Sequence, residues 1–201
     1  MCAKPAKESM KRKQAVRELP PIIGRVWLDE RQIRRKVRQI ARQIERDYEG
    51  LVPHLVTVMK GGLFFLTDLA RALRIPHTLD FLAITSYGPQ THTGEVRLTK
   101  DLDEPIAGRH VIVIEDILDT GLTLAYILKN LERRKPASLR VCVLLDRPYR
   151  RLIDIPIHYK GFDAPDEFLV GYGLDWRQQY RSLPYIGIIK PEVLRAEAAG
   201  G

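Results

Sequence analysis

Cysteine is scarce in this chain, which has only two among its 201 residues. Cys2 lies close to the N-terminus, and Cys142 lies inside the apolar run LRVCVLLD. Two cysteines cannot build a disulfide framework, and their positions fit no zinc-binding spacing. We expect Cys142 to be a buried structural thiol. We also expect the protein to be located in the reducing cytoplasm.

Long hydrophobic runs are also missing. No stretch approaches the roughly 18 consecutive apolar residues that a membrane-spanning helix needs. The N-terminal sequence MCAKPAKESMKRKQAVREL has no apolar core of the kind found in secretory signals. We therefore expect no membrane partner and no secretion. A hydrophobic content of 45% with 29% charged residues is typical of a soluble globular protein.

Aromatic residues do not interleave with the most basic segments, although the net charge is +8. A solvated helix face and tail explain this excess, and nucleic acid is therefore not an expected partner. A partner surface, or a positive field that favours small anionic substrates, stays open as an alternative. The basic residues concentrate in the first 17 positions and on one predicted helix: Lys4, Lys7, Lys11, Arg12, Lys13, Arg17, Arg31, Arg34, Arg35, Lys36, Arg38 and Arg42.

The order of apolar segments predicts an α/β fold with a largely parallel sheet. The clearest helix covers residues 29–48, where five apolar residues recur at helical spacing after the capping residue Asp29. Short apolar pieces beyond residue 150 predict a small β-rich cap at the end of the sheet. Strands are expected at 54–59, 78–85, 111–114 and 138–145, and further helices at 63–73 and 121–134.

This pattern divides the chain into three parts. Residues 1–20 are expected to form a flexible basic tail that ends at a Pro-Pro pair. Residues 21–190 are expected to form a single domain that includes the core and the cap. Residues 191–201 are expected to form a C-terminal tail.

The segment VIVIEDILDTGLTL, residues 111–124, carries most of the chemical information. In an open α/β sheet, ligands bind outside the carboxyl ends of the strands, and this segment predicts a loop between a strand and a helix there. The residues Asp119, Thr120, Gly121, Leu122 and Thr123 should turn into the helix and direct backbone N–H groups at an anion such as phosphate.

Two further carboxylates, Glu115 and Asp116, lie just before this turn. They could accept hydrogen bonds from the hydroxyl groups of a sugar, and a phosphate beside a diol is a ribose phosphate. The plain alternative is that acids followed by Thr-Gly only cap a helix. The complete pattern of buried strand, paired acids, phosphate turn and helix is much more specific than a cap.

At this point the chain resembles the type I phosphoribosyltransferases, whose motif for 5-phosphoribosyl-1-pyrophosphate (PRPP) has the form of residues 111–124. Other segments resemble the hypoxanthine-guanine branch of that family, in the expected order over residues 20–190. They are VMKGGLFF (58–65), TSYG (85–88), LLDRP (144–148) and DEFLVGYGLDWRQQYRSLPYIGII (166–189). The resemblance implies a mostly parallel sheet flanked by helices, with a small β-rich hood near the C-terminus and a flexible lid loop.

The reaction implied by the resemblance joins PRPP to N9 of hypoxanthine or guanine, and it yields IMP or GMP and pyrophosphate. Asp119 is then the candidate general base, accepting the proton at N7 of the purine. Magnesium, held by PRPP oxygens and water, would balance the acids. The residues that the resemblance places near the metal are Glu115, Asp116 and Asp175.

The resemblance also assigns the pyrophosphate contacts. Lys60 and the backbone of Gly61 would form the pyrophosphate loop, with a cis peptide bond between Met59 and Lys60. Ser86 and Tyr87 open the polar loop 86–97, which would act as a lid that excludes water during catalysis. Arg181 would contact pyrophosphate directly, and Asp175 would meet a second magnesium there.

The purine pocket follows from the same resemblance. Phe168 would stack on the ring, and the backbone of Leu169 would meet the ring edge beside Asp175. Arg147 departs from the family pattern, which commonly has lysine donating to O6 of the purine. Because both side chains only donate hydrogen bonds, a 6-oxopurine is still expected over adenine, but the ranking of hypoxanthine, guanine and xanthine stays open.

A different class of function is the alternative interpretation. The basic tail and helix would suit a regulator that has this fold and binds nucleotides or RNA without turnover. The presence of Asp119 and Asp175 favours the enzyme, because a regulator without turnover needs neither a general base nor a metal ligand. By resemblance we also expect a homodimer or homotetramer.

Overall fold

The computed structural model describes residues 19–86 and 96–200, which fold around a six-stranded sheet of order β4-β3-β2-β5-β6-β7. All neighbouring pairs are parallel except β3 and β4, so β4 is an antiparallel edge strand. The strands are β2 (His54–Met59), β3 (Thr78–Ser86), β4 (Val96–Lys100), β5 (His110–Leu118), β6 (Ser138–Asp146) and β7 (Tyr159–Asp163). The predicted α/β fold class is confirmed.

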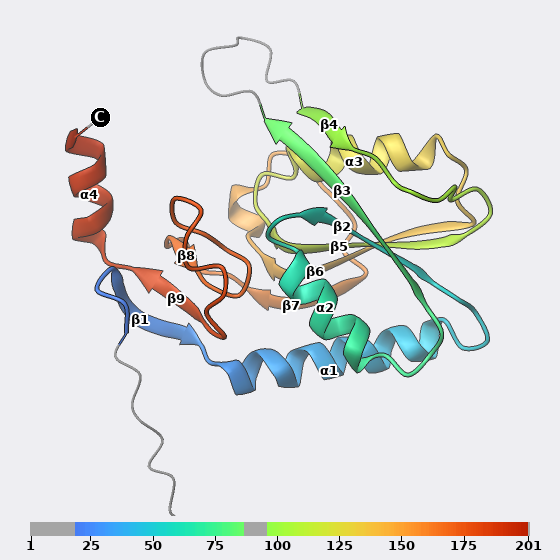
Figure 1. The fold of residues 1–201 in the computed structure, drawn as a ribbon, viewed down its shortest axis with the longest axis horizontal. Helices are drawn as coiled ribbons and strands as arrows, with labels where there is room; N and C mark the ends of the chain where they lie inside the picture. Colours follow the sequence, from blue (N-terminus) through green and yellow to red (C-terminus); the bar gives the residue numbers. More distant parts are fainter. Residues whose placement is uncertain (1–18, 87–95, 201) are drawn as a thin grey trace, which may run out of the picture.

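Helices cover both faces of this sheet (Figure 1). Helices α1 (Glu30–Asp47) and α2 (Leu63–Ala72) bury their apolar residues in one core cluster, together with Ile112 and Ile114 of β5. Helix α3 (Leu122–Glu132) lies on the other face, where Val111 and Val113 join its cluster. Successive side chains of a strand point to opposite faces, which explains why β5 is apolar at every position from 111 to 114.

Helix α1 begins as its sequence predicts. The Asp29 carboxylate accepts a hydrogen bond from the Gln32 backbone N at 2.7 Å, and the Gln32 side chain accepts one from the Asp29 backbone N at 2.9 Å. This reciprocal capping box satisfies two backbone donors that the first helical turn leaves free. The residues at helical spacing are buried in the core: Ile33, Val37, Ile40, Ile44 and Tyr48.

A second, three-stranded antiparallel sheet of order β1-β9-β8 forms the hood, beside the carboxyl ends of β2, β5 and β6 (Figure 1). Its strands are β1 (Ile23–Leu28), β8 (Leu169–Val170) and β9 (Ile186–Ile189). The hood therefore contains a strand from the N-terminal end of the domain, which the sequence pattern did not predict. Helix α4 (Pro191–Gly200) follows β9 and lies within the segment expected as a C-terminal tail.

Two expectations about strands are wrong. The piece IPIHYKGF was expected in the cap, but residues 159–163 form β7 and pair with β6 in the main sheet. Residues 115–118 were expected in a loop, but they extend β5, because β6 runs on to Asp146 and supplies their hydrogen-bond partners. Glu115 and Asp116 are thus held on a strand rather than on a loop.

Among residues 19–86 and 96–200, no helix has the length and apolar character needed to cross a bilayer.

Candidate active site

Three parallel strands end at the same edge of the sheet, and each is followed by residues that the sequence singled out. Lys60 and Gly61 follow β2, Asp119 follows β5, and Arg147 follows β6. Parallel β2, β5 and β6 are neighbours in the sheet, so their carboxyl ends lie side by side. The fold thus brings together segments that are up to 87 positions apart in the sequence.

A cavity of about 330 Å³ opens between these strand ends. Its walls bring together nine of the predicted residues: Lys60, Gly61, Glu115, Asp116, Asp119, Thr120, Gly121, Thr123 and Arg181. Leu122 starts α3 and is exposed, outside the cavity lining. Ser86 ends β3, whereas Tyr87 and most of the predicted lid lie outside the described residues.

The turn into α3 has the geometry of an anion site. Gly121 has a positive φ of 83°, a conformation that glycine adopts without strain. A Cβ placed on Gly121 would lie 3.0 Å from the carbonyl oxygen of Ile153, so the turn is packed against the 149–153 segment. The backbone N of Leu152 donates to the carbonyl of Thr120 at 2.9 Å and fixes that packing. The backbone N of Leu122 donates to the Thr120 hydroxyl at 3.4 Å, and the N–H groups that follow it in the first turn of α3 can point at a ligand.

The Lys60 loop is packed tightly between β5 and the hood. The Met59–Lys60 peptide bond is cis, as the resemblance implies. An added Cβ on Gly61 would collide with the carboxylate of Asp116, and one on Gly173 would collide with the carbonyl of Gly61. The Lys60 ammonium group donates to the Gln178 side chain at 3.3 Å. Only glycine at 61 and 173 allows these three segments to meet.

The ionised forms of two carboxylates in this cavity, Glu115 and Asp116, are destabilised by their surroundings. Burial, followed by the neighbouring charge of Asp116, raises the pKa of Glu115 well above its usual value. Burial also raises the pKa of Asp116 to about 6, against backbone hydrogen bonds and the Arg181 charge, which lower it. Buried carboxylates of this kind are stabilised by hydroxyl donors or by a cation. The cavity is therefore suited to a polyhydroxylated ligand that brings positive charge with it.

Arg181 links the strand edge to the hood. Its guanidinium group forms an ion pair with Asp175 at 2.7 Å and donates to the carbonyl of Gly173 at 2.7 Å. Asp175 also accepts from the backbone N of Gln178 at 2.8 Å. Asp175 and Arg181 therefore line the same cavity as Asp116.

A second cavity of about 350 Å³ adjoins the first, and it contains the predicted purine-pocket residues Arg147, Phe168, Leu169 and Asp175. Phe168 is 42% exposed, and its ring makes an edge contact with Trp176 at 5.0 Å between centroids. One face of this ring is therefore open to a flat ligand. The two cavities share four residues: Asp116, Ile117, Asp119 and Arg181.

Asp119 stands at the boundary of the two cavities. Its Oδ2 is 3.6 Å from a guanidinium nitrogen of Arg147 and 3.6 Å from one of Arg150. Its Oδ1 is shielded from solvent and has no hydrogen-bond partner within the described part of the chain. Arg147 is buried, and its other terminal nitrogen donates to the carbonyl of Glu167 at 2.5 Å. One carboxylate oxygen therefore lies near two arginines, while the other has an unused acceptor.

Comparison with known proteins identifies the family. The family model of the phosphoribosyl transferase domain matches residues 27–177. The chain belongs to the phosphoribosyl transferase family. A hypoxanthine-guanine phosphoribosyltransferase of Mycobacterium avium is 45% identical over 181 residues, which are 87% of this chain and 89% of that protein. One from Bacillus subtilis is 41% identical over 172 residues, which are 85% of this chain and 96% of that protein.

Solved structures agree with this transferase in fold. A crystal structure of a hypoxanthine-guanine phosphoribosyltransferase from Bacillus anthracis, with HEPES in its active site, superposes with a TM-score of 0.80. It is 45% identical, and the match covers 84% of this chain and 99% of that one.

The sequence did not single out every residue that lines the transferase site. Ile117 lies in both cavities but reads as an ordinary strand residue between acids. Arg150 lies in the purine-pocket cavity and forms an ion pair with Asp166 at 2.7 Å as well as approaching Asp119. Its only sequence signal is its place in the basic run RPYRR, three residues beyond Arg147.

Proposed function

We propose that this phosphoribosyl transferase is a purine salvage enzyme that transfers the 5-phosphoribosyl group of PRPP to N9 of hypoxanthine or guanine. The shared wall of the two cavities supports this proposal most strongly. A ribose that reaches from the phosphate turn to Phe168 has to pass Asp116 and Asp119. The substrates of the M. avium and B. subtilis relatives, as their names state them, agree with this geometry.

The chemistry follows from these positions. The N9–C1′ bond forms while the C1′–oxygen bond to pyrophosphate breaks, and pyrophosphate leaves with the bonding electrons. The proton on N7 of the purine passes to the free oxygen of Asp119. Thr120, Thr123 and the first N–H groups of α3 hold the 5′-phosphate, while Glu115 and Asp116 accept from the ribose hydroxyls. Lys60, the Gly61 backbone and Arg181 neutralise the departing pyrophosphate, with Ser86 and Tyr87 at the lid.

Magnesium is the proposed cofactor, and the residues fit it. No group of three or more His, Cys, Asp or Glu residues among those described could hold a metal alone, but Mg²⁺ ordinarily binds one or two carboxylates together with phosphate oxygens and water. Burial raises the pKa of Asp116, and a cation bound beside it would favour its charged form. Asp175, Asp116 and Glu115 would hold the ion, which supplies charge neutralisation on pyrophosphate when bound.

The first test is turnover with PRPP, magnesium and, separately, hypoxanthine, guanine, xanthine and adenine. We expect product from hypoxanthine or guanine and none from adenine, because Arg147 can donate to a 6-oxo group but cannot accept from a 6-amino group. If xanthine is the best substrate, the proposed reaction stands but the proposed base specificity is wrong. No turnover with any purine would refute the enzyme and favour a nucleotide- or RNA-binding regulator.

Replacing Arg147 by alanine is expected to lower kcat/KM for hypoxanthine about 10- to 100-fold, the value of a charged hydrogen bond. Arg147→Lys keeps a positive hydrogen-bond donor and is expected to retain more activity than Arg147→Ala. Steady-state kinetics on both variants check this. Activity of Arg147→Ala close to that of the wild type would show that Arg147 does not recognise the purine.

Replacing Phe168 by alanine is expected to raise KM for the purine about tenfold or more, because aromatic stacking on a base contributes about 1–3 kcal/mol. The dissociation constant of PRPP should stay unchanged, since Phe168 lines only the second of the two substrate cavities. Phe168→Tyr keeps the ring and serves as the control. An equal loss of affinity for both substrates would instead indicate a distorted hood.

We also propose that residues 21–190 act as a single domain and that the enzyme is a cytoplasmic homodimer or homotetramer, as the family resemblance implies. Multi-angle light scattering on the purified chain tests the oligomeric state.

A further inference from the structure

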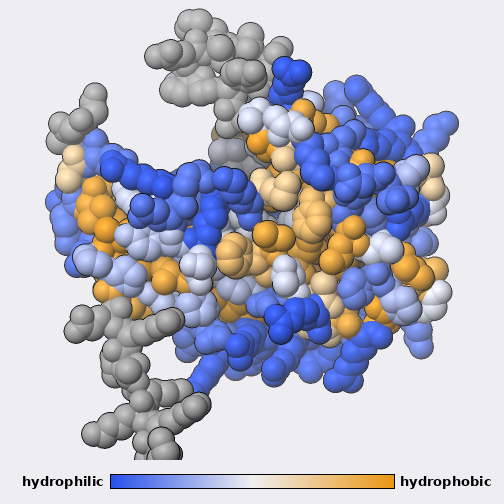
Figure 2. Space-filling view, viewed as in Figure 1, coloured by the Kyte–Doolittle hydropathy of each residue, from blue (hydrophilic) through white to orange (hydrophobic). Residues whose placement is uncertain are grey.

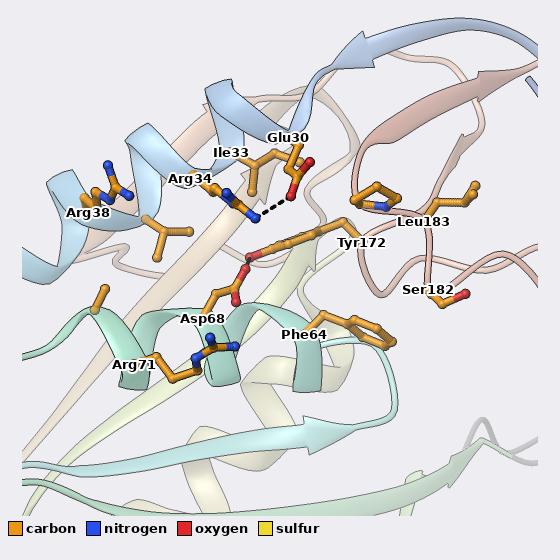
Figure 3. Close-up of a pocket in the computed structure, with 13 residues that line it drawn as sticks. Glu30, Ile33, Arg34, Arg38, Phe64, Asp68, Arg71, Tyr172, Ser182 and Leu183 are labelled. Atoms are coloured by element: carbon orange, nitrogen blue, oxygen red, sulfur yellow. Dashed lines mark hydrogen bonds and ion pairs between the residues drawn. The ribbon is translucent and has the colours of Figure 1, made fainter. Parts of the chain in front are cut away.

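A cavity lies away from the active site, between α1, α2 and the turn at residues 182–184 (Figure 3). Its volume is about 520 Å³, and it shares no lining residue with the two substrate cavities. The transferase reaction proposed above gives it no role. Its size falls in the range of small-molecule sites, about 300–1,000 Å³.

The floor of this cavity is apolar and partly aromatic. Ile33 and Val37 of α1 are buried beneath it, and Phe64 of α2, Tyr172 and Leu183 complete it. The Tyr172 hydroxyl donates to the Asp68 carboxylate at 2.8 Å, which fixes the ring between the two helices (Figure 3). Tyr172 itself is only 7% exposed, so the partly exposed ring of Phe64 is the surface on which a flat ring can stack.

The rim of the cavity carries unpaired positive charge. Glu30 is neutralised by Arg34 at 2.5 Å, and Asp68 already accepts from Tyr172. The guanidinium groups of Arg38 and Arg71, which extend from the two facing helices, have neither an ion pair nor a hydrogen bond within residues 19–86 and 96–200 (Figure 3). In Figure 2 hydrophilic residues follow the edge along α1, beside hydrophobic residues over α2.

We propose that this cavity binds a nucleoside phosphate at a site separate from the active site. The base would stack on Phe64 beside the buried Tyr172, and the phosphate would pair with Arg38 and Arg71. Guanidinium groups form strong, directional hydrogen bonds with phosphate oxygens. Inorganic phosphate would leave the aromatic floor uncovered, and an uncharged aromatic compound would leave both arginines unpaired. A nucleoside phosphate satisfies both halves of the cavity.

Two elements that line this site adjoin the pyrophosphate loop at Lys60 and Gly61. Tyr172 lies between Gly171 and Gly173, and Gly173 packs directly against the carbonyl of Gly61. Helix α2, which carries Phe64 and Asp68, begins immediately after that loop. A nucleotide that presses on Tyr172 and α2 is therefore expected to change KM for PRPP.

Isothermal titration with adenosine 5′-monophosphate (AMP) tests the site without purine turnover, so its result is independent of the proposed reaction. We expect one site per chain, with affinity reduced about tenfold or more in Arg38→Ala/Arg71→Ala, since each charged hydrogen bond contributes about 1.5–3 kcal/mol. The control Arg31→Ala/Arg35→Ala removes the same charge from α1 outside the cavity, and it should bind like the wild type. Inorganic phosphate should bind about tenfold more weakly than AMP, because it lacks the base that stacks for about 1–3 kcal/mol.

Several results would overturn the proposal. Binding that survives Arg38→Ala/Arg71→Ala would place AMP at the phosphate turn of the active site. An equal loss in the control pair would mean nonspecific charge attraction. Absence of saturable binding, together with a smaller assembly for Arg38→Ala/Arg71→Ala in light scattering, would make the cavity a contact between subunits. An unchanged KM for PRPP in the presence of saturating AMP would refute the coupling to the pyrophosphate loop.

Discussion

Asp119→Asn is expected to lower kcat about 10²- to 10⁴-fold, the usual contribution of a positioned general base. The structure gives a reason why even an isosteric amide should fail. Oδ2 of Asp119 faces two guanidinium groups, each 3.6 Å away, while Oδ1 has no partner in the described part of the chain. The arginines only donate hydrogen bonds, so they would hold the carbonyl oxygen of asparagine. The amide NH₂ would then face the purine, where an acceptor is needed.

The measurement is kcat at saturating PRPP and hypoxanthine, with the dissociation constant of PRPP determined separately. Asp119→Glu is the matched control, because it keeps the charge and an acceptor but displaces them by one methylene. We expect its kcat to lie between those of the wild type and Asp119→Asn. If Asp119→Asn binds PRPP normally and retains kcat within about tenfold of the wild type, less than general bases ordinarily contribute, then Asp119 only positions the substrate.

The sequence was most informative where function depends on neighbouring residues. The phosphate turn after β5 is a contiguous segment, so its acids, hydroxyls and glycine could be recognised together. The parallel sheet whose strand ends carry Lys60, Asp119 and Arg147 was predicted from the alternation of buried strands and amphipathic helices, although the order of its strands was not. In these parts local pattern and tertiary contacts agree.

The sequence did not predict the roles of residues that reach the site only because a distant segment of the chain folds back against it. Arg150 reaches Asp119 because the 149–153 segment returns to the phosphate turn, where Leu152 donates to Thr120 at 2.9 Å. The loop that carries Asp175 contains non-glycine residues with positive φ, at Arg177 and Gln178 among others. Such backbone has no helical or strand period. Strands of four to six residues, such as β1 and β7, are likewise too short for a period to assign them to one sheet or the other.

Asp116→Asn is expected to stabilise the ligand-free enzyme at pH 8 while weakening PRPP binding about 10- to 100-fold through the lost charged acceptor. Burial raises the pKa of Asp116 to about 6 from an ordinary value of 3.8. Between these values the folded state binds more protons than the unfolded state, so this group makes the free energy of unfolding fall as pH rises. Asparagine removes the buried charge. Because the side chain is partly exposed, we expect a gain of about 1–2 kcal/mol above pH 7, against 1.36 kcal/mol for each full pKa unit.

Urea denaturation of the wild type and Asp116→Asn at pH 5 and pH 8 measures this effect. At pH 5 the carboxyl is largely protonated in the folded state but ionised in the unfolded state, so about half of the stability difference should remain; it should vanish only below the ordinary value of 3.8. Asp101→Asn is the control with the opposite sign. The hydrogen bond from Arg134 lowers the pKa of Asp101, so its charge favours the folded state and its removal should cost a little stability at pH 8. A variant Asp116→Asn that is less stable than the wild type at pH 8 would mean that Asp116 already has a favourable partner in the free enzyme. In that case the carboxylate would not be held ready for ribose and magnesium.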